Sequence, residues 1–200
     1  MTSVVLEHYE SVTINDMMMR LVYARTRLDT SKVWNMLTEM TVVYHELEKY
    51  GLAFLEISPR SWIMLPNGEI RLSMFHGVMH PYTELSKDEY INENLPAPEY
   101  IKHGKIHPKS NIYGLGYLIY LVTGLKFAFQ FYDPSKVKRA VLNFYKVLPN
   151  SKMVRVYPED LTSLVLAMLH KNPDGRPTWG SLLITARRDP GIREIGRAHV

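Results

Sequence analysis

The chain has 200 residues, of which 46% are hydrophobic and 22% charged, and this composition fits one globular domain and excludes wholesale disorder. Cysteine is absent, which excludes disulfides, cysteine-based zinc sites and thiol nucleophiles. The net charge is +4, and the basic residues are scattered rather than gathered in a stripe with aromatics. Specific nucleic-acid binding is therefore not expected.

The sequence carries no pattern of export or membrane insertion. Its longest uncharged stretch, Ser110–Leu125, has 16 residues and includes Tyr, Gly and Thr, so it is too short and too polar to span a bilayer. The first residues lack the basic and apolar regions of a signal peptide. We expect an intracellular, cytoplasmic protein without membrane association. The last residues, Glu194–Val200, read like a translated sequencing adapter and are expected to be non-native.

The first third of the chain predicts a short strand and two helices. Val4–Glu7 is a β-prone run, and the chain is expected to turn after it. Apolar residues at helical spacing predict a helix over Ile14–Arg25, whose three consecutive methionines are interpreted as core filler. A longer helix is predicted from the N-cap candidates at Asp29 to Ser31 as far as Gly51.

The middle of the chain predicts a hairpin and then a long loop. Two short strands, Trp62–Leu65 and Ile70–Ser73, flank Pro66, Asn67 and Gly68, and an Asn-Gly pair favours a tight hairpin turn. The polar segment from Phe75 to Lys109, rich in Pro and His, predicts a loop.

The last half predicts mostly helices, so the expected fold class is mainly α. The segment Ser110–Thr123 is apolar on every side and is predicted to be a fully buried central helix that ends at Gly124. Amphipathic patterns predict three further helices. These are Ser135–Leu148, Pro158–His170 and Trp179–Arg187.

Two distant motifs give this order of elements a resemblance to a known family. The segment APEYIKHGKIHPKSNIYGLGYLIYLVTG contains Ala97, Pro98 and Glu99, and MLHKNPDGRPTW contains Arg176 and Pro177. Together they resemble the end of the activation segment and the late Arg-Pro segment in the large, C-terminal lobe (C-lobe) of eukaryotic protein kinases. The resemblance implies a mainly α, kinase-like C-lobe with a short β-hairpin at its catalytic loop, spanning residues 4–187 and followed by a tail, 188–200.

The resemblance also assigns structural roles. It implies that Glu99 and Arg176 form a buried ion pair, that Asn111 holds the catalytic-loop backbone in place of an Asp, and that Gly116 matches a family glycine. The short Gly-Leu-Gly sequence at Gly114–Gly116 lies inside the predicted central helix, so we interpret it as a close helix contact and not as a phosphate-binding loop.

The positions that the family uses for catalysis are altered. In place of the His-Arg-Asp motif the chain has Phe54, Leu55 and Glu56, Ser58 stands for the assisting Lys, and Ser61 stands for the metal-binding Asn. The metal-binding Asp-Phe-Gly motif is matched by Met74, Phe75 and His76, and methionine does not bind a hard cation. His76 and His80 are expected to be ordinary loop histidines, since a metal site needs three or four converging ligands.

These residues lead to a hypothesis of function and an alternative. The start of the sequence resembles the end of the kinase small lobe, so we expect the small lobe to be absent. The leading hypothesis is a catalytically inactive, pseudokinase-like C-lobe that serves as a protein-interaction or scaffold module and needs no cofactor, with a looser likeness to the kinase non-catalytic C-lobe domain. The alternative is a fragment of a divergent Ser/Thr protein kinase, which would use Mg-ATP with Glu56 orienting the substrate. A nucleic-acid or membrane-surface binder ranks last.

A protein partner is expected on one of two surfaces. The first is an apolar face that loss of the small lobe would uncover, and the same face would serve if the domain associates with itself. Its candidate residues are Met17, Met18, Trp62 and Met64. The second surface lies between the activation segment and the helix within PSKVKRAVLNFYKVL.

Overall fold

The structure, a computed structural model, describes residues 10–54, 57–73, 78–80, 97–104, 106–125, 134–144, 148 and 151–187. Helices dominate this part of the chain, accompanied by a three-stranded and a two-stranded antiparallel sheet, which confirms the predicted fold class. The strand predicted at Val4–Glu7 and the tail from 188 to 200 lie outside the described residues.

The first helix and the hairpin form one end of the domain. Strand β1 (Val12–Thr13) leads directly into α1 (Ile14–Tyr23), and the Thr13 hydroxyl accepts a hydrogen bond from the Asp16 amide, which caps the helix. β1 pairs antiparallel with β3 (Trp62–Met64), which pairs with β4 (Ile70–Leu72) in the predicted hairpin. Strand β1 was not predicted, because two residues carry no periodic signal.

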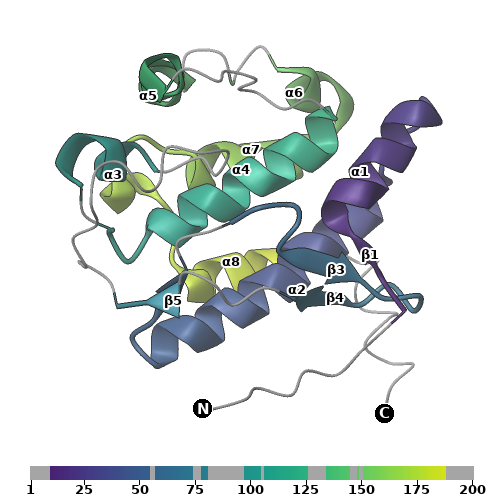
Figure 1. The fold of residues 1–200 in the computed structure, drawn as a ribbon, viewed down its shortest axis with the longest axis horizontal. Helices are drawn as coiled ribbons and strands as arrows, with labels where there is room; N and C mark the ends of the chain where they lie inside the picture. The colour runs from purple at the N-terminus through teal and green to yellow at the C-terminus, as the bar shows by residue number, and fades with distance from the viewer. Residues whose placement is uncertain are drawn as a thin grey trace.

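Two long helices form the centre of the domain. α2 (Thr30–Lys49) follows its Asp29 N-cap, and Gly51 turns the chain with a φ of 65° just beyond it, as predicted. α4 (Ser110–Gly124) crosses the middle of the view in Figure 1 and contacts α2, α6 and α7. Nearly all of its side chains are buried, which confirms the prediction of a central helix.

The last third of the chain packs smaller helices around α4 and α2. α7 (Glu159–Met168) and α8 (Trp179–Ala186) were predicted, whereas α6 (Lys152–Val156) and the 3-10 turn η3 (Pro173–Gly175) were not. α8 packs along α2, and α7 packs along α4 (Figure 1). The predicted helix at Ser135–Leu148 is observed as α5 (Pro134–Asn143).

The predicted loop over Phe75–Lys109 contains regular structure after all. α3 (Pro98–His103) begins with Pro98 at its first position and ends at Gly104 with a φ of 68°. β5 (Val78–Met79) pairs antiparallel with β2 (Ala53–Phe54). Both elements are too short to produce a periodic pattern, so the sequence showed only their Pro and Gly boundaries.

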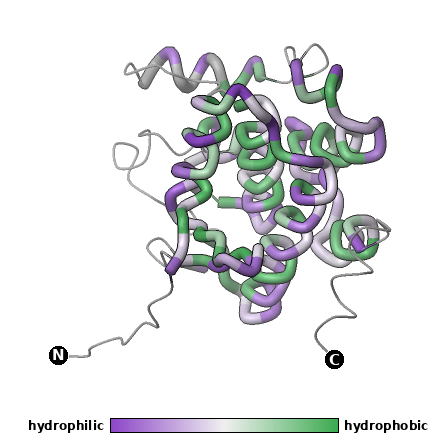
Figure 2. Tube along the Cα trace, turned by 90° about the vertical axis from the view of Figure 1, so that its right-hand side faces the viewer, coloured by the Kyte–Doolittle hydropathy of each residue, from purple (hydrophilic) through white to green (hydrophobic). Residues whose placement is uncertain are grey.

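One hydrophobic core joins these elements. Figure 2 shows hydrophobic and hydrophilic positions alternating along the helical coils, as expected of amphipathic helices that share a core. Three aromatic rings connect α2, β3 and α8 at its centre: Tyr44 packs edge-on against Trp62 with ring centroids 5.6 Å apart and stacks on Trp179 at 5.2 Å. All three side chains are almost fully buried.

Candidate functional site

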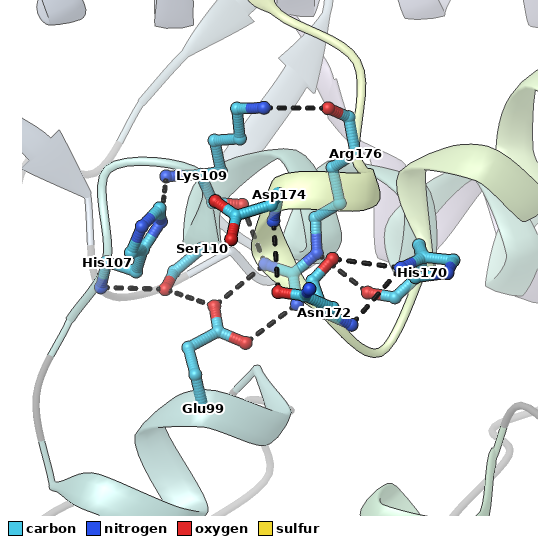
Figure 3. Close-up of polar contacts among 8 residues, drawn as sticks. All are labelled: Glu99, His107, Lys109, Ser110, His170, Asn172, Asp174 and Arg176. Atoms are coloured by element: carbon cyan, nitrogen blue, oxygen red, sulfur yellow. Dashed lines mark hydrogen bonds and ion pairs between the residues drawn. The ribbon is translucent and has the colours of Figure 1, made fainter.

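The ion pair predicted from the two motifs is present. Arg176 donates from both terminal nitrogens to the two carboxylate oxygens of Glu99, and each N–O distance is 2.7 Å (Figure 3). The contact joins α3 to the segment after η3, 77 residues further along the chain. Arg176 is 2% exposed and Glu99 is 8% exposed, so the pair is shielded from water and from salt screening.

Further hydrogen bonds satisfy the rest of this ion pair. The remaining Arg176 nitrogen donates to the His170 carbonyl at 2.9 Å, and one terminal nitrogen also donates to the Lys109 carbonyl at 2.9 Å. Lys109 in turn donates through Nζ to the Arg176 carbonyl, and the Ser110 hydroxyl donates to Glu99 at 2.6 Å. We call Glu99, Lys109, Ser110, His170 and Arg176 the Glu99–Arg176 joint.

The electrostatics of the joint favour an ionised Glu99. Burial opposes ionisation, but the hydrogen bonds and the positive charge of Arg176, helped by Ser110, outweigh it and lower the pKa of the carboxyl. The Arg176 guanidinium also lies 5.0 Å from the ring centroid of Tyr113 on α4, a cation–π contact. The joint therefore ties α3, the start of α4 and the segment after α7 together as a charged but fully paired unit.

Asn111 holds the backbone at the start of the predicted catalytic loop. Its side-chain oxygen accepts a hydrogen bond from the Phe54 amide at 3.0 Å, and its side-chain nitrogen donates to the Phe54 carbonyl. The predicted contact is present, and it has two arms instead of one. An ionised Asp has no donor, whereas the Asn amide satisfies both the N–H and the C=O of the buried residue Phe54.

The two glycines of α4 mark close helix contacts, as predicted. A Cβ on Gly116 would come within 2.8 Å of the Met168 Cβ on α7. A Cβ on Gly114 would come within 2.4 Å of the Ile57 side chain, which follows the catalytic-loop positions. These glycines let α4 approach α7 and the loop, and neither contact resembles a phosphate-binding loop.

Three of the altered catalytic positions lie within the described residues. Phe54 is in β2 and is 1% exposed, and Ser58 accepts a hydrogen bond from the Arg60 amide at 3.2 Å. Ser61 is 0% exposed, and its hydroxyl has no hydrogen-bond partner among the described residues. The other positions lie outside the described residues. They are Leu55, Glu56, Met74, Phe75 and His76.

The predicted apolar partner surface is wrong for three of its four residues. Met17 is 6% exposed, Met18 is 2% exposed and Trp62 is 0% exposed, while Met64 is half-buried. α1 packs against β1 and β3, and the Asn15 amide donates to the Pro59 carbonyl, so the helix and the hairpin cover this surface themselves. A change at Trp62 therefore tests folding and not binding.

The second predicted surface is partly described. α3 contacts α5, where the exposed side chains include Lys136 and Arg139, and α3 itself exposes Lys102 and His103. The Nδ1 atom of His80 lies 3.2 Å from the Gly51 carbonyl oxygen. Among the described residues, no group of three or more His, Asp or Glu side chains is placed to hold a metal ion.

Several members of the Glu99–Arg176 joint were not predicted from the sequence. Lys109, Ser110 and His170 lie next to the motif residues, but two of them contribute a backbone carbonyl, which no residue type reveals. Ser110 begins α4, and a hydroxyl at that place could have been considered as a partner for Glu99.

Comparison with known proteins gives a distant relationship. No protein-family model matches the chain. The chain is similar to the mitogen-activated protein kinase kinase MST7 of Pyricularia oryzae, with 26% identity over 162 residues, a match that covers 76% of this chain and 38% of that protein. The match supports a kinase-like relationship, and the mainly helical fold with its small antiparallel sheet is compatible with a kinase-like C-lobe. Within the described residues, no helix combines the length and the apolarity that crossing a bilayer requires.

Proposed function

We propose that this chain is a kinase-related domain that does not transfer phosphate and that acts by binding other proteins. The similarity to MST7 supports the kinase relationship. The burial of Ser61 supports the absence of phosphate transfer. Ser61 stands at the position of the metal-binding Asn, and its side chain has no exposed surface with which to reach a metal or a nucleotide. Kinases neutralise the charge that develops during phosphoryl transfer through metal ions held at such positions.

The contrast between the Glu99–Arg176 joint and the altered catalytic-loop positions supports a binding role. In the joint the two charges are paired and every guanidinium nitrogen and carboxylate oxygen has a hydrogen bond, which fits a chain that keeps the interactions that hold a large lobe together. The positions matched to the catalytic loop carry side chains that cannot hold Mg²⁺ in the same way. A binding module needs a stable fold but not the catalytic side chains. A maintained fold with replaced catalytic side chains therefore fits a binding role.

The competing proposal is a piece of a divergent Ser/Thr protein kinase that uses Mg-ATP. The chain spans only 38% of MST7, a protein described as a mitogen-activated protein kinase kinase, and this observation favours it. Under this proposal Glu56 orients the substrate hydroxyl.

A thermal-shift titration with ATP, with and without Mg²⁺, separates the two proposals. Ligand at a hundred times its Kd stabilises the folded state by about 2.7 kcal/mol, or about 5–11 °C for a domain of this size. We expect no magnesium-dependent shift, while an active protein kinase in parallel should show one. Transfer of labelled phosphate from ATP to a protein substrate, lost in Glu56→Gln, would contradict the proposed function.

A further inference from the structure

The outer face of α1 is apolar although nothing in the described structure covers it. Three of the six large hydrophobic side chains that are exposed in the described part of the chain lie on this helix: Met19 at 40%, Val22 at 45% and Tyr23 at 81%. Residues three and four positions apart share a helix face, so these three form one stripe. The opposite face of α1 already supplies Ile14, Met17 and Met18 to the core. α1 is therefore apolar on two sides, and it lies at the edge of the domain (Figure 1).

Three arginines lie within α1 or in the four residues that follow it. Arg20 lies in the last turn of α1, Arg25 follows the helix with a φ of 53°, and Arg27 lies two residues further on. All three are exposed, and none forms an ion pair with another described residue. A cation in the last turn interacts favourably with the helix dipole. That accounts for Arg20, but not for a group of unpaired arginines beside an exposed apolar stripe.

The neighbouring helix α6 also exposes apolar and basic side chains. The Tyr157 hydroxyl donates to the Leu28 carbonyl at 2.8 Å, which fixes the end of α6 beside the segment that follows α1. The two residues before Tyr157 are Arg155 and Val156, and both are exposed, Val156 at 43%. Exposed apolar and basic side chains therefore come from two elements that this hydrogen bond holds together.

We propose that the α1 face, made of Met19, Arg20, Val22, Tyr23, Arg25 and Arg27, binds an acidic amphipathic segment of a partner protein. The apolar side chains of such a segment would cover the stripe, and its carboxylates would pair with the arginines. This inference rests on the proposed protein-binding role, but it does not depend on whether the chain transfers phosphate. An anionic membrane is a weaker fit, because even with Arg155 the four arginines only reach the lower end of the roughly four to eight Lys or Arg residues usual in lipid-binding clusters, and the acidic Asp16 and Asp29 are exposed nearby in the sequence.

The probe is a fluorescein-labelled peptide of about 18 residues, long enough to form a helix, with Leu along one face and Glu along its flanks. Its matched control carries Lys in place of every Glu. Fluorescence anisotropy with the full chain should show that the Glu peptide binds at least about tenfold more tightly than the Lys peptide. Tyr23→Ser and Arg27→Glu should each weaken binding by about tenfold, as expected of interface hot spots.

Two variants serve as matched controls. Tyr50 is 76% exposed at the end of α2, and Arg187 is exposed at the end of α8. Tyr50→Ser and Arg187→Glu remove the same kinds of side chain elsewhere and should leave the Kd within about twofold. Far-ultraviolet circular dichroism checks that each variant is folded. If Tyr50→Ser weakens binding as much as Tyr23→Ser, or if the Glu peptide does not bind, the α1 proposal is overturned while a protein partner on the α3–α5 surface would remain to be tested.

The other occupants of this face give distinct results. Binding to vesicles of phosphatidylserine and phosphatidylcholine that is lost in Tyr23→Ser, without peptide binding, would assign the face to a membrane. A dimer in analytical ultracentrifugation that Tyr23→Ser dissociates would assign it to a second copy of this chain. Either result overturns the proposal, and neither bears on phosphate transfer, which the magnesium and ATP titration measures separately.

Discussion

The Glu99–Arg176 joint and the catalytic-loop positions belong to one domain, but they differ in whether their buried polar groups have hydrogen-bond partners. In the joint, both carboxylate oxygens and all three guanidinium nitrogens have hydrogen-bond partners at 2.6–2.9 Å. At Ser61 a hydroxyl is buried without a hydrogen-bond partner in the part of the chain that the structure describes. A buried polar group that lacks a hydrogen bond lowers stability, so Ser61 carries a cost that the hydrogen-bonded groups of the joint avoid.

The difference separates the interactions that maintain the fold from those that would perform chemistry. The backbone at Phe54, just before the altered loop positions, is held by the two Asn111 hydrogen bonds and by the pairing of β2 with β5, and neither contact needs a catalytic side chain. Each region can therefore be changed independently of the other.

Removing the charge of Arg176 should have the largest effect. Arg176→Met leaves the Glu99 carboxylate buried without its partner, and breaking a buried pair in this way costs about 3–5 kcal/mol of the free energy of unfolding. Urea unfolding followed by circular dichroism measures the loss. The matched control is Arg187→Met at the exposed end of α8, which should change stability by less than about 0.5 kcal/mol.

A double variant tests whether the loss comes from the stranded charge. Glu99→Leu combined with Arg176→Met removes both charges, and it should be more stable than Arg176→Met alone, because replacing both partners avoids an unpaired buried ion. If the two changes simply add, the pair is not the source of the effect.

Restoring the family residue at Asn111 should weaken the loop. Asn111→Asp keeps the acceptor for the Phe54 amide but loses the donor to the Phe54 carbonyl, and it places a charge at a buried position. We expect a loss of about 1–3 kcal/mol, the cost of leaving a buried polar group unpaired. Hydrogen exchange at the Phe54 amide should accelerate as well. Unchanged stability would show that the loop does not depend on the two-armed contact.

Two glycines of α4 should respond to the same substitution with opposite signs. Gly116→Ala places a methyl group 2.8 Å from the Met168 Cβ, and such overpacking costs about 1–3 kcal/mol. Gly124→Ala meets no atom within 4 Å at the end of the helix, so it should stabilise the domain by up to about 1 kcal/mol through the higher helix propensity of Ala. Thermal unfolding of both variants tests this, and a loss in Gly124→Ala would contradict it.

Long elements of the fold could be predicted from the sequence, and short ones could not. α2 and α4 were predicted because their apolar positions repeat over several turns, and the hairpin because Gly68 closes a turn with a φ of 88°. β1, β2, β5, α3 and α6 have two to six residues each and therefore show no period.

The residues of the candidate site also divide into those that the sequence could predict and those that it could not. The Glu99–Arg176 pair and the Asn111 contact could be predicted because motif residues identify the side chains involved. The exposed apolar surface was placed wrongly, since a sequence shows that Met17, Met18 and Trp62 are apolar but not which element covers them. Met17 and Met18 lie on α1, which packs against β3, and Trp62 packs against Tyr44 on α2. These contacts join segments far apart in the sequence, and local patterns do not specify them.

The joint should also make stability depend on pH. The pKa of Glu99 is lower in the folded state than its unfolded value of about 4.3, so its ionised form stabilises the fold. This stabilisation is complete above about pH 4.3 and is lost as the pH falls through the lower, folded pKa. The slope is at most about 1.4 kcal/mol per pH unit for one carboxyl. Urea titrations of the wild type and of Glu99→Gln at acid pH measure the difference.

Glu39 on α2 provides the opposite case and the smallest effect. Burial and the nearby charge of Glu69 raise its pKa, and Arg71 only partly offsets them. A carboxyl with a raised folded pKa destabilises the fold when ionised, so stability is regained as the pH falls through that pKa. Glu39→Gln should therefore be slightly more stable than the wild type at pH 7, and this advantage should disappear in acid. Since Glu39 is only half-buried, water screens the interaction and the change will be small. The two carboxyls should thus shift the acid unfolding curve in opposite directions, and equal directions would contradict the assignment of Glu99 as the paired charge.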